Sequence, residues 1–262
     1  MSEFIDRPAQ KRFQRRALAG FTDVDFLYQE SQQRLLERFS AMKVPVGERV
    51  VVAAEHTRDA VSLDAHGFAN NTRYVEPGDA LATLPKGAAS VVLSNLAHSI
   101  EDMAFFFSSA QQALSENGLL LFSLLGPRTL FELRQAFAHD PYPHVHRFYD
   151  MHDVGDLLLH QGFESPVMEA AAIQVNYAAL STLWSELRQM GAQCVLPQRR
   201  KGLQGKASWQ TMLSNYPQQD NGKYPVTIEL VIGHAWKSSR TADSPRDQEV
   251  TVAIDQIKRK SA

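Results

Sequence analysis

The chain has 262 residues with a formal net charge of −2, and 44% of its residues are hydrophobic. This length suits one domain with an inserted cap, and the hydrophobic content is enough to bury a full core. The near-neutral charge excludes a general attraction to nucleic acid. No apolar run approaches the roughly 20 residues that a membrane-spanning helix needs. We therefore expect no nucleic-acid partner and no membrane span.

The chain has a single cysteine, Cys194, so no internal disulfide can form. A lone thiol fits a reducing compartment, and residues 1–16 contain no apolar signal-peptide core. We expect a cytoplasmic protein in which Cys194 has a packing role.

The N-terminal part of the chain predicts a helix followed by a buried strand. Apolar residues recur at helical spacing over residues 7–41, and Pro45 and Gly47 break the pattern. The β-branched run at residues 49–54 then indicates a strand of a parallel sheet. Residues 55–78 are polar and show only weak periodicity.

The middle of the chain alternates strands with helices. The expected strands are residues 88–93 and 119–125, and the expected helices are residues 101–114, 129–137 and 152–160. This alternation indicates βαβ units and a parallel sheet.

The C-terminal third has a different pattern. Residues 166–176 and 227–236 predict two strands of a hairpin, and residues 180–190 and 209–216 predict helices. Residues 237–249 are rich in Ser, Arg and Asp, and we expect them to be disordered.

These patterns divide the chain into five expected segments. They are N-terminal helices over residues 1–45, a sheet core over 46–172, a cap insert over 173–224, a last core strand over 225–237, and a disordered tail over 238–262.

Several short segments carry a family pattern. They are residues 126–134, 144–148, 150–156, 173–177, 190–192 and 224–227, the last leading to 233–236. Together they resemble the malonyl-carrier-protein O-methyltransferases of biotin synthesis, and equally their relatives, the mitochondrial complex I assembly factors. Residues 4–7 and 250–254 are more similar to the second group.

The resemblance covers most of residues 4–53 and 79–255. It implies an α/β class I (Rossmann-like) S-adenosylmethionine (SAM) methyltransferase fold. Such a fold has a doubly wound, mostly parallel sheet with a C-terminal antiparallel hairpin and a helical cap insert.

The loop after the first strand departs from the family pattern. The family has a sequence similar to Asp-Leu-Gly-Cys-Gly-x-Gly there, whereas this chain has Val52-Ala53-Ala54-Glu55-His56-Thr57-Arg58. All three glycines are replaced, and the acid becomes Val52. Glycine lets a backbone approach a ligand closely, so we expect side chains at residues 54–58 to fill the cofactor space.

Other residues of the resemblance point to the same cofactor site. The family's adenine-contacting acid matches Asp79, followed by Ala80, and the segment after the fourth family strand matches Ser94 and Asn95. Asn95 could equally be a turn or capping residue. Too little chain separates Arg58 from Asp79 for a complete βα unit, so we expect a shortened or absent second strand and loss of its ribose-binding acid.

These departures favour a non-catalytic, methyltransferase-fold binding or assembly protein without a cofactor. The alternative is an active SAM-dependent O-methyltransferase acting on a carboxylate such as malonyl-carrier protein. A third, weaker possibility is an iron-dependent hydroxylase in the style of an assembly factor. No catalytic residue can be assigned from the sequence.

Two further clusters have competing interpretations. The cap contains five basic residues: Arg188, Arg199, Arg200, Lys201 and Lys206. They could bind an acidic protein partner, either a carrier protein or an assembly client. Alternatively, they could be merely solvated. His144, His146 and Asp150 could form a metal site. The family pattern already explains them as a loop and a helix start, so we expect no metal.

Overall fold

A computed structural model describes residues 5–54, 57, 68, 71–97, 100 and 102–238. Its centre is a six-stranded sheet in the order β2-β1-β3-β4-β6-β5. The strands are β1 (Glu48–Val52), β2 (Thr72–Val75), β3 (Ala89–Ser94), β4 (Leu114–Leu125), β5 (Phe163–Tyr177) and β6 (Tyr224–Lys237). The first four strands run parallel, and β6 pairs antiparallel with both β4 and β5. This confirms the expected fold class with its C-terminal hairpin.

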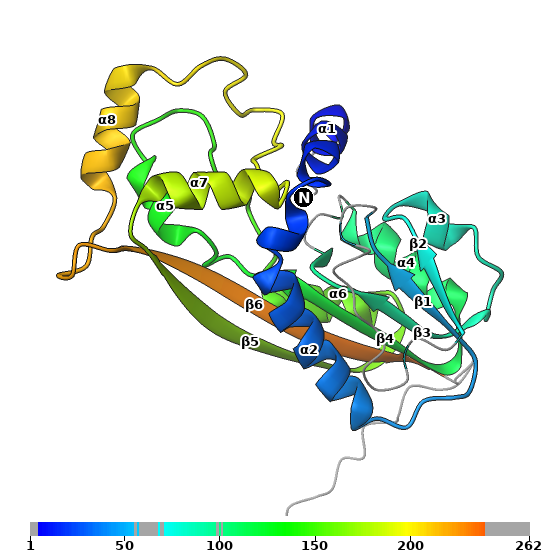
Figure 1. Ribbon diagram of the computed structural model, residues 1–262. Coiled ribbons are helices and arrows are strands. Elements are labelled where there is room, and N and C mark those ends of the chain that lie inside the picture. Colours follow the sequence, from blue (N-terminus) through cyan, green and yellow to red (C-terminus); the bar gives the residue numbers. More distant parts are fainter. Residues whose placement is uncertain are drawn as a thin grey trace, which may run out of the picture.

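Helices cover both faces of the sheet (Figure 1). They are α1 (Arg7–Ala17), α2 (Phe26–Ser40), α3 (Asp79–Ala82), α4 (Met103–Ala113), α5 (Phe131–Ala136), α6 (Met151–His160), α7 (Leu180–Gln189) and α8 (Lys206–Asn215). Among the residues described, no helix is both long and apolar enough to cross a bilayer.

Alternating side chains of the parallel strands build two cores. In β1, Val51 belongs to the core under α2, whereas Val50 and Val52 belong to the core under α4 and α6. In β4, Leu119 belongs to the core under α2 and Leu120 to the core under α4 and α6. A parallel strand buried on both faces has a continuously apolar sequence, which explains why these strands were predictable.

The N-terminal region, expected to be helical over residues 7–41, forms two helices. A short 3₁₀ turn, Phe21–Asp23, separates α1 from α2. This turn brings Phe21 into the interior, where its ring packs edge-on against Tyr28 at a centroid distance of 4.9 Å. Helical spacing on both sides of the turn concealed the break.

Strand β2 lies within the polar stretch that predicted no element. It pairs with β1 from Arg49↔Thr72 to Val52↔Val75 and ends four residues before Asp79. A single strand therefore separates β1 from Asp79 in the described chain, as expected for a shortened unit. The expected tail falls almost wholly outside the described residues, which end at Ser238.

Gly233 gives a test of the packing between β4 and β6. A Cβ at Gly233 would fall within the ring of the fully buried Phe122. We expect Gly233→Ala to lower the free energy of unfolding by about 2 kcal/mol, because overpacked cores typically lose 1–3 kcal/mol. Chemical denaturation followed by circular dichroism would measure this.

Gly202→Ala is the matched control, since nothing lies within 4 Å of an added Cβ there. We expect it to change stability by less than about 0.5 kcal/mol. Equal stabilities for the two variants would contradict the packing described.

Candidate functional site

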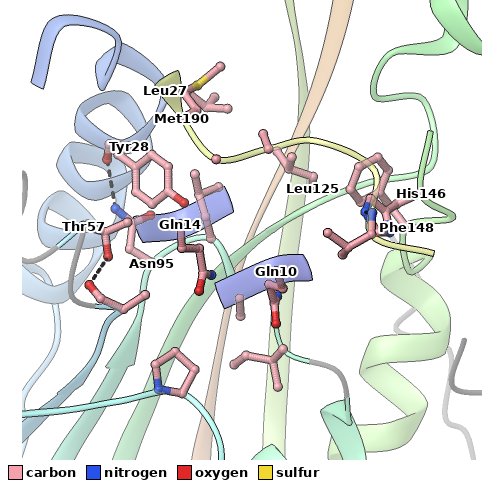
Figure 2. Close-up of a pocket in the computed structure, with 18 of the residues that line it drawn as sticks. Gln10, Gln14, Leu27, Tyr28, Thr57, Asn95, Leu125, His146, Phe148 and Met190 are labelled. Carbon is pink, nitrogen blue, oxygen red and sulfur yellow. Dashed lines mark hydrogen bonds between the residues drawn. The ribbon is translucent and has the colours of Figure 1, made fainter. Parts of the chain in front are cut away.

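A cavity opens at the carboxyl ends of β1, β3 and β4 (Figure 2). Ligands of open α/β sheets bind at this edge. Ala53 and Ala54 follow β1, Asn95 follows β3, and Leu125 ends β4. The empty space of this cavity, counted together with its open mouth, is about 1170 Å³.

Three separate parts of the chain cover this cavity. Gln10 and Gln14 reach it from α1, Tyr28 from α2, and Met190 from the end of α7 (Figure 2). Burial raises the pKa of Tyr28 well above its ordinary value. Its hydroxyl is therefore protonated at neutral pH and can donate a hydrogen bond.

A buried polar network fixes the floor of the cavity. Ser31 Oγ of α2 lies 2.7 Å from both Asn95 Oδ1 and Ser123 Oγ. The Ser123 hydroxyl also donates to Asn95 Oδ1 at 2.9 Å and accepts the Leu96 N–H at 2.7 Å. Asn95 Nδ2 donates to the Tyr28 carbonyl at 2.9 Å. The Asn95 side chain therefore ties α2 to β4 through long-range hydrogen bonds, and Asn95 also lines the cavity.

Backbone strain accompanies this network. Leu96 has a φ of 53° in the left-handed region, which a non-glycine residue rarely adopts. Strained residues persist where surrounding interactions hold them, and they are common at functional sites. Here the Ser123 hydroxyl holds the Leu96 N–H.

A second cavity adjoins the first at the carboxyl ends of β1 and β2. The two share Gln10, Gln14, Ala54, Pro77 and Ile100, and the second has about 1520 Å³ of space with its mouth. Glu76, Gly78 and Asp79 form part of its rim. Gly78 has a φ of 113°, a conformation that glycine allows at little cost.

Asp79 and Glu76 therefore lie beside the same space. Asp79 lines the second cavity, whereas Ala80 packs against the core and lines neither cavity. Ser94, the buried last residue of β3, lines the first cavity.

The sequence analysis expected the ribose-binding acid to be lost, and the structure offers a candidate for it. Glu76 directly follows β2, the strand beside β1, and this is where the resemblance requires that acid. Sequence analysis missed Glu76 because it missed β2. The β-prone run Thr72-Arg73-Tyr74-Val75 was the available signal.

The structure tests the expectation that side chains fill the cofactor space only in part. Ala54 and Thr57 border the cavity. An alanine at position 54 adds one methyl group to the glycine backbone of the family pattern, and the Thr57 hydroxyl turns back to the Ala54 carbonyl at 2.9 Å. Glu55, His56 and Arg58 lie outside the described residues, so the expectation for these three side chains stays a prediction.

Hydrogen bonds among Asp6, His146, Val195 and Arg199 join the start of α1 to the cap above the cavity. We call this set of contacts the clasp. The Asp6 N–H donates to the Val195 carbonyl at 2.8 Å, and the Val195 N–H donates to His146 Nε2 at 3.1 Å. Arg199 pairs with the Asp6 carboxylate at 2.8 Å, and Asp6 also caps α1 through the Ala9 N–H. Because His146 Nε2 accepts a hydrogen bond, the proton of the neutral ring resides on Nδ1.

Two of the basic residues predicted to bind a partner also have structural contacts. Arg199 belongs to the clasp, and Arg200 lies 3.5 Å from the Asp140 carboxylate and over the Tyr142 ring at 4.5 Å. Lys201 and Lys206 are exposed. Partner binding by these residues, and by Arg188, remains a prediction.

Asp140 organises the loop beneath the cap. Burial alone would raise the pKa of Asp140, but hydrogen bonds from Gln204, the Tyr142 N–H and Ser208 hold it well below its ordinary value. Burial lowers the pKa of the nearby His144, and the Asp140 charge opposes that effect. Asp140 is thus an anion that joins α8 to the chain after α5.

The potential metal ligands serve other purposes. His144 stacks on Phe137 with a centroid distance of 3.6 Å, His146 accepts from Val195, and Asp150 caps α6. Among the described residues, no three His, Cys, Asp or Glu side chains converge on a metal position.

Comparison with known proteins decides the family. The chain is 35% identical over 277 residues to malonyl-[acyl-carrier protein] O-methyltransferase 1 of Coxiella burnetii, and the match covers 98% of both chains. The corresponding protein of Gallionella capsiferriformans is 34% identical, over 90% of this chain and 93% of its own length. The chain belongs to the malonyl-[acyl-carrier protein] O-methyltransferase family. No family model matches the chain.

Membership of the malonyl-[acyl-carrier protein] O-methyltransferase family corrects the functional expectation. The expected non-catalytic assembly protein is wrong, because relatives named as O-methyltransferases match nearly the whole chain. The expectation of a cofactor-free protein depended on the same premise. The 277 aligned positions exceed the 262 residues of the chain, so the relative has residues that this chain lacks.

Solved structures support the family fold at low sequence identity. A candidate methyltransferase of Bacillus halodurans has a TM-score of 0.50 at 15% identity, over 78% of this chain and 97% of its own. The YcgJ protein of Bacillus subtilis has a TM-score of 0.50 at 11% identity, over 79% of this chain. At identities this low, the two structures support the fold and nothing about activity.

The clasp predicts how α1 is held over the cavity. Its hydrogen bonds, with Arg199 first, lower the pKa of Asp6. The charged clasp is therefore intact above the unfolded Asp pKa of about 3.9, and it is lost as the pH falls through the depressed folded value. We expect Arg199→Ala to increase hydrogen exchange of the α1 amides at neutral pH, measured by mass spectrometry.

Lys206→Ala is the control for Arg199→Ala, because Lys206 is exposed at the start of α8 and lies outside the clasp. It should leave α1 exchange unchanged. Wild-type exchange rates for α1 in the Arg199 variant would show that the ion pair does not hold this helix.

Proposed function

We propose that the chain transfers the methyl group of SAM to the free carboxylate of a malonyl group carried on an acyl carrier protein. One observation carries this proposal. A chain that matches O-methyltransferases over nearly its full length retains an open cavity at the sheet edge where its family resemblance places the cofactor.

The side chains around the two cavities suit both ligands. Glu76 and Asp79 can accept hydrogen bonds from ribose hydroxyls and from the adenine side of the cofactor. Ala53 and Ala54 leave room for it beside the backbone. When bound, SAM supplies an electrophilic methyl group on a sulfonium centre.

The transfer requires no side chain to remove a proton. A carboxylic acid with a pKa near 4 is already ionised at neutral pH, so the acceptor oxygen is nucleophilic without a general base. This accounts for the failure of sequence analysis to identify a catalytic residue. The protein contributes mainly by holding two reactants together, an effect that can supply several kcal/mol.

Apolar walls strengthen this positioning. Leu27, Leu125 and Ile228 line the cavity and are nearly fully buried. Excluding water removes a competing hydration shell from the acceptor carboxylate. The protonated Tyr28 hydroxyl can orient a substrate oxygen without competing as a nucleophile.

The direct test is methyl transfer from radiolabelled SAM. We expect label to enter malonyl-carrier protein as a base-labile methyl ester. Acetyl-carrier protein, which has no free carboxylate, should remain unlabelled. No transfer to malonyl-carrier protein by a folded preparation would refute the proposed function.

Cofactor binding gives a separate prediction. We expect Glu76→Gln and Asp79→Asn each to weaken SAM binding about tenfold, because a charge-assisted hydrogen bond is worth roughly 1.5–3 kcal/mol. Isothermal titration would measure the dissociation constants. Asp220→Asn is the control, since Asp220 is exposed in a turn and lines neither cavity. Unchanged affinity in both site variants would contradict the assignment of these acids.

A further inference from the structure

A third cavity lies beneath the cap, between α5, α7 and the start of α8. We call it the cap chamber, and it encloses about 820 Å³ together with its mouth. Phe137, Trp184 and Trp209 form aromatic walls, with the Trp184 and Trp209 ring centroids 5.7 Å apart. The proposed chemistry does not use this space.

The cap chamber adjoins the main cavity along a shared wall. The residues that line both are Leu130, His146, Phe148, Leu187, Ala192 and Gln193. In Figure 2, His146 and Phe148 stand together at one side of the main cavity, where this wall begins. A long substrate could therefore occupy both spaces, with its reactive end beside β1.

One polar atom of the shared wall has no hydrogen-bond partner. Gln193 Oε1 is buried, and no group in the described part of the chain donates to it. A buried acceptor without a donor has lost its hydrogen bonds to water and gained none in return, which is unfavourable. Such an atom at the junction of two cavities points to a ligand that brings an N–H or O–H group.

The outer end of the cap chamber carries positive charge. Arg188, in the last turn of α7, lines the chamber and is exposed to solvent. A guanidinium at this position suits a phosphate group held at the surface. The chamber thus presents a hydrogen-bond acceptor, aromatic walls and a cation.

We propose that the cap chamber holds the phosphopantetheine arm of a thioester substrate. This inference rests on the proposed function, which requires a malonyl group on such an arm. The arm has two amide N–H donors, apolar methyl groups and a terminal phosphate, and each finds a complementary group among the residues that line the chamber. Gln193 Oε1 accepts a hydrogen bond from an arm amide, and Arg188 faces the phosphate.

The first test separates arm binding from malonyl binding. Gln193→Leu keeps the side-chain volume but removes the acceptor. We expect its kcat/KM for malonyl-coenzyme A, which carries the arm, to fall about tenfold through KM. With S-ethyl malonyl thioester, which lacks the arm amides, it should stay within twofold of wild type.

Gln198→Leu is the matched control, because Gln198 is exposed and lines none of the three cavities. Equal losses for both substrates in Gln193→Leu, or no loss for either, would overturn the arm assignment. Absence of methyl transfer by the wild-type protein to any malonyl thioester would instead refute the proposed function.

The second test needs no turnover. Cys194 lines the cap chamber, is partly buried, and is the only cysteine of the chain. We expect malonyl-coenzyme A, without SAM, to slow alkylation of Cys194 by iodoacetamide at least fivefold, as measured by mass spectrometry. Adenosine 3′,5′-bisphosphate, which is the same molecule without its arm, should leave the rate unchanged.

This second result is independent of catalysis, so it tests the chamber even if the proposed reaction fails. An alkylation rate unaffected by malonyl-coenzyme A would refute the proposal that the cap chamber holds the arm. Equal protection by adenosine 3′,5′-bisphosphate would do the same, because the protecting group would then be the nucleotide.

Discussion

The cavity depends on one buried polar contact, the meeting of Ser31, Asn95 and Ser123. Each of these groups would be costly to bury alone, so α2, β3 and β4 must come together in the one arrangement that satisfies all three. That arrangement places Tyr28 over the cavity and holds Leu96 in its left-handed conformation. The apolar cores hold the layers together, whereas this network sets the position of α2 at the site.

The shortened chain after β1 shows how a site can survive the loss of its local motif. On the side of β1 away from β3, the strand that pairs with it is β2. Parallel strands end at a common edge, so the residue after β2 lies near the residues after β1. Glu76 thus reaches the proposed cofactor site through topology, although no sequence motif surrounds it.

Much of the fold could be predicted because buried parallel strands have distinctive sequences. The hydrophobic runs of β1, β3 and β4 marked the sheet, and the hairpin of β5 and β6 followed from alternation. The short, half-polar β2 and the turn at Phe21–Asp23 had no comparable signal. The site was harder still, since replacement of the family's glycines at Ala54, His56 and Arg58 says nothing about where the neighbouring side chains point. Inferring inactivity from those substitutions was therefore wrong.

The clasp joins residues that are 193 positions apart, Asp6 and Arg199. Through the Val195 peptide, it also connects the start of α1 to the wall residue His146. A single substitution at either end of this contact would therefore release both the start of α1 and the cap segment that borders the main cavity and the cap chamber, so distant parts of the chain share one point of attachment above the site.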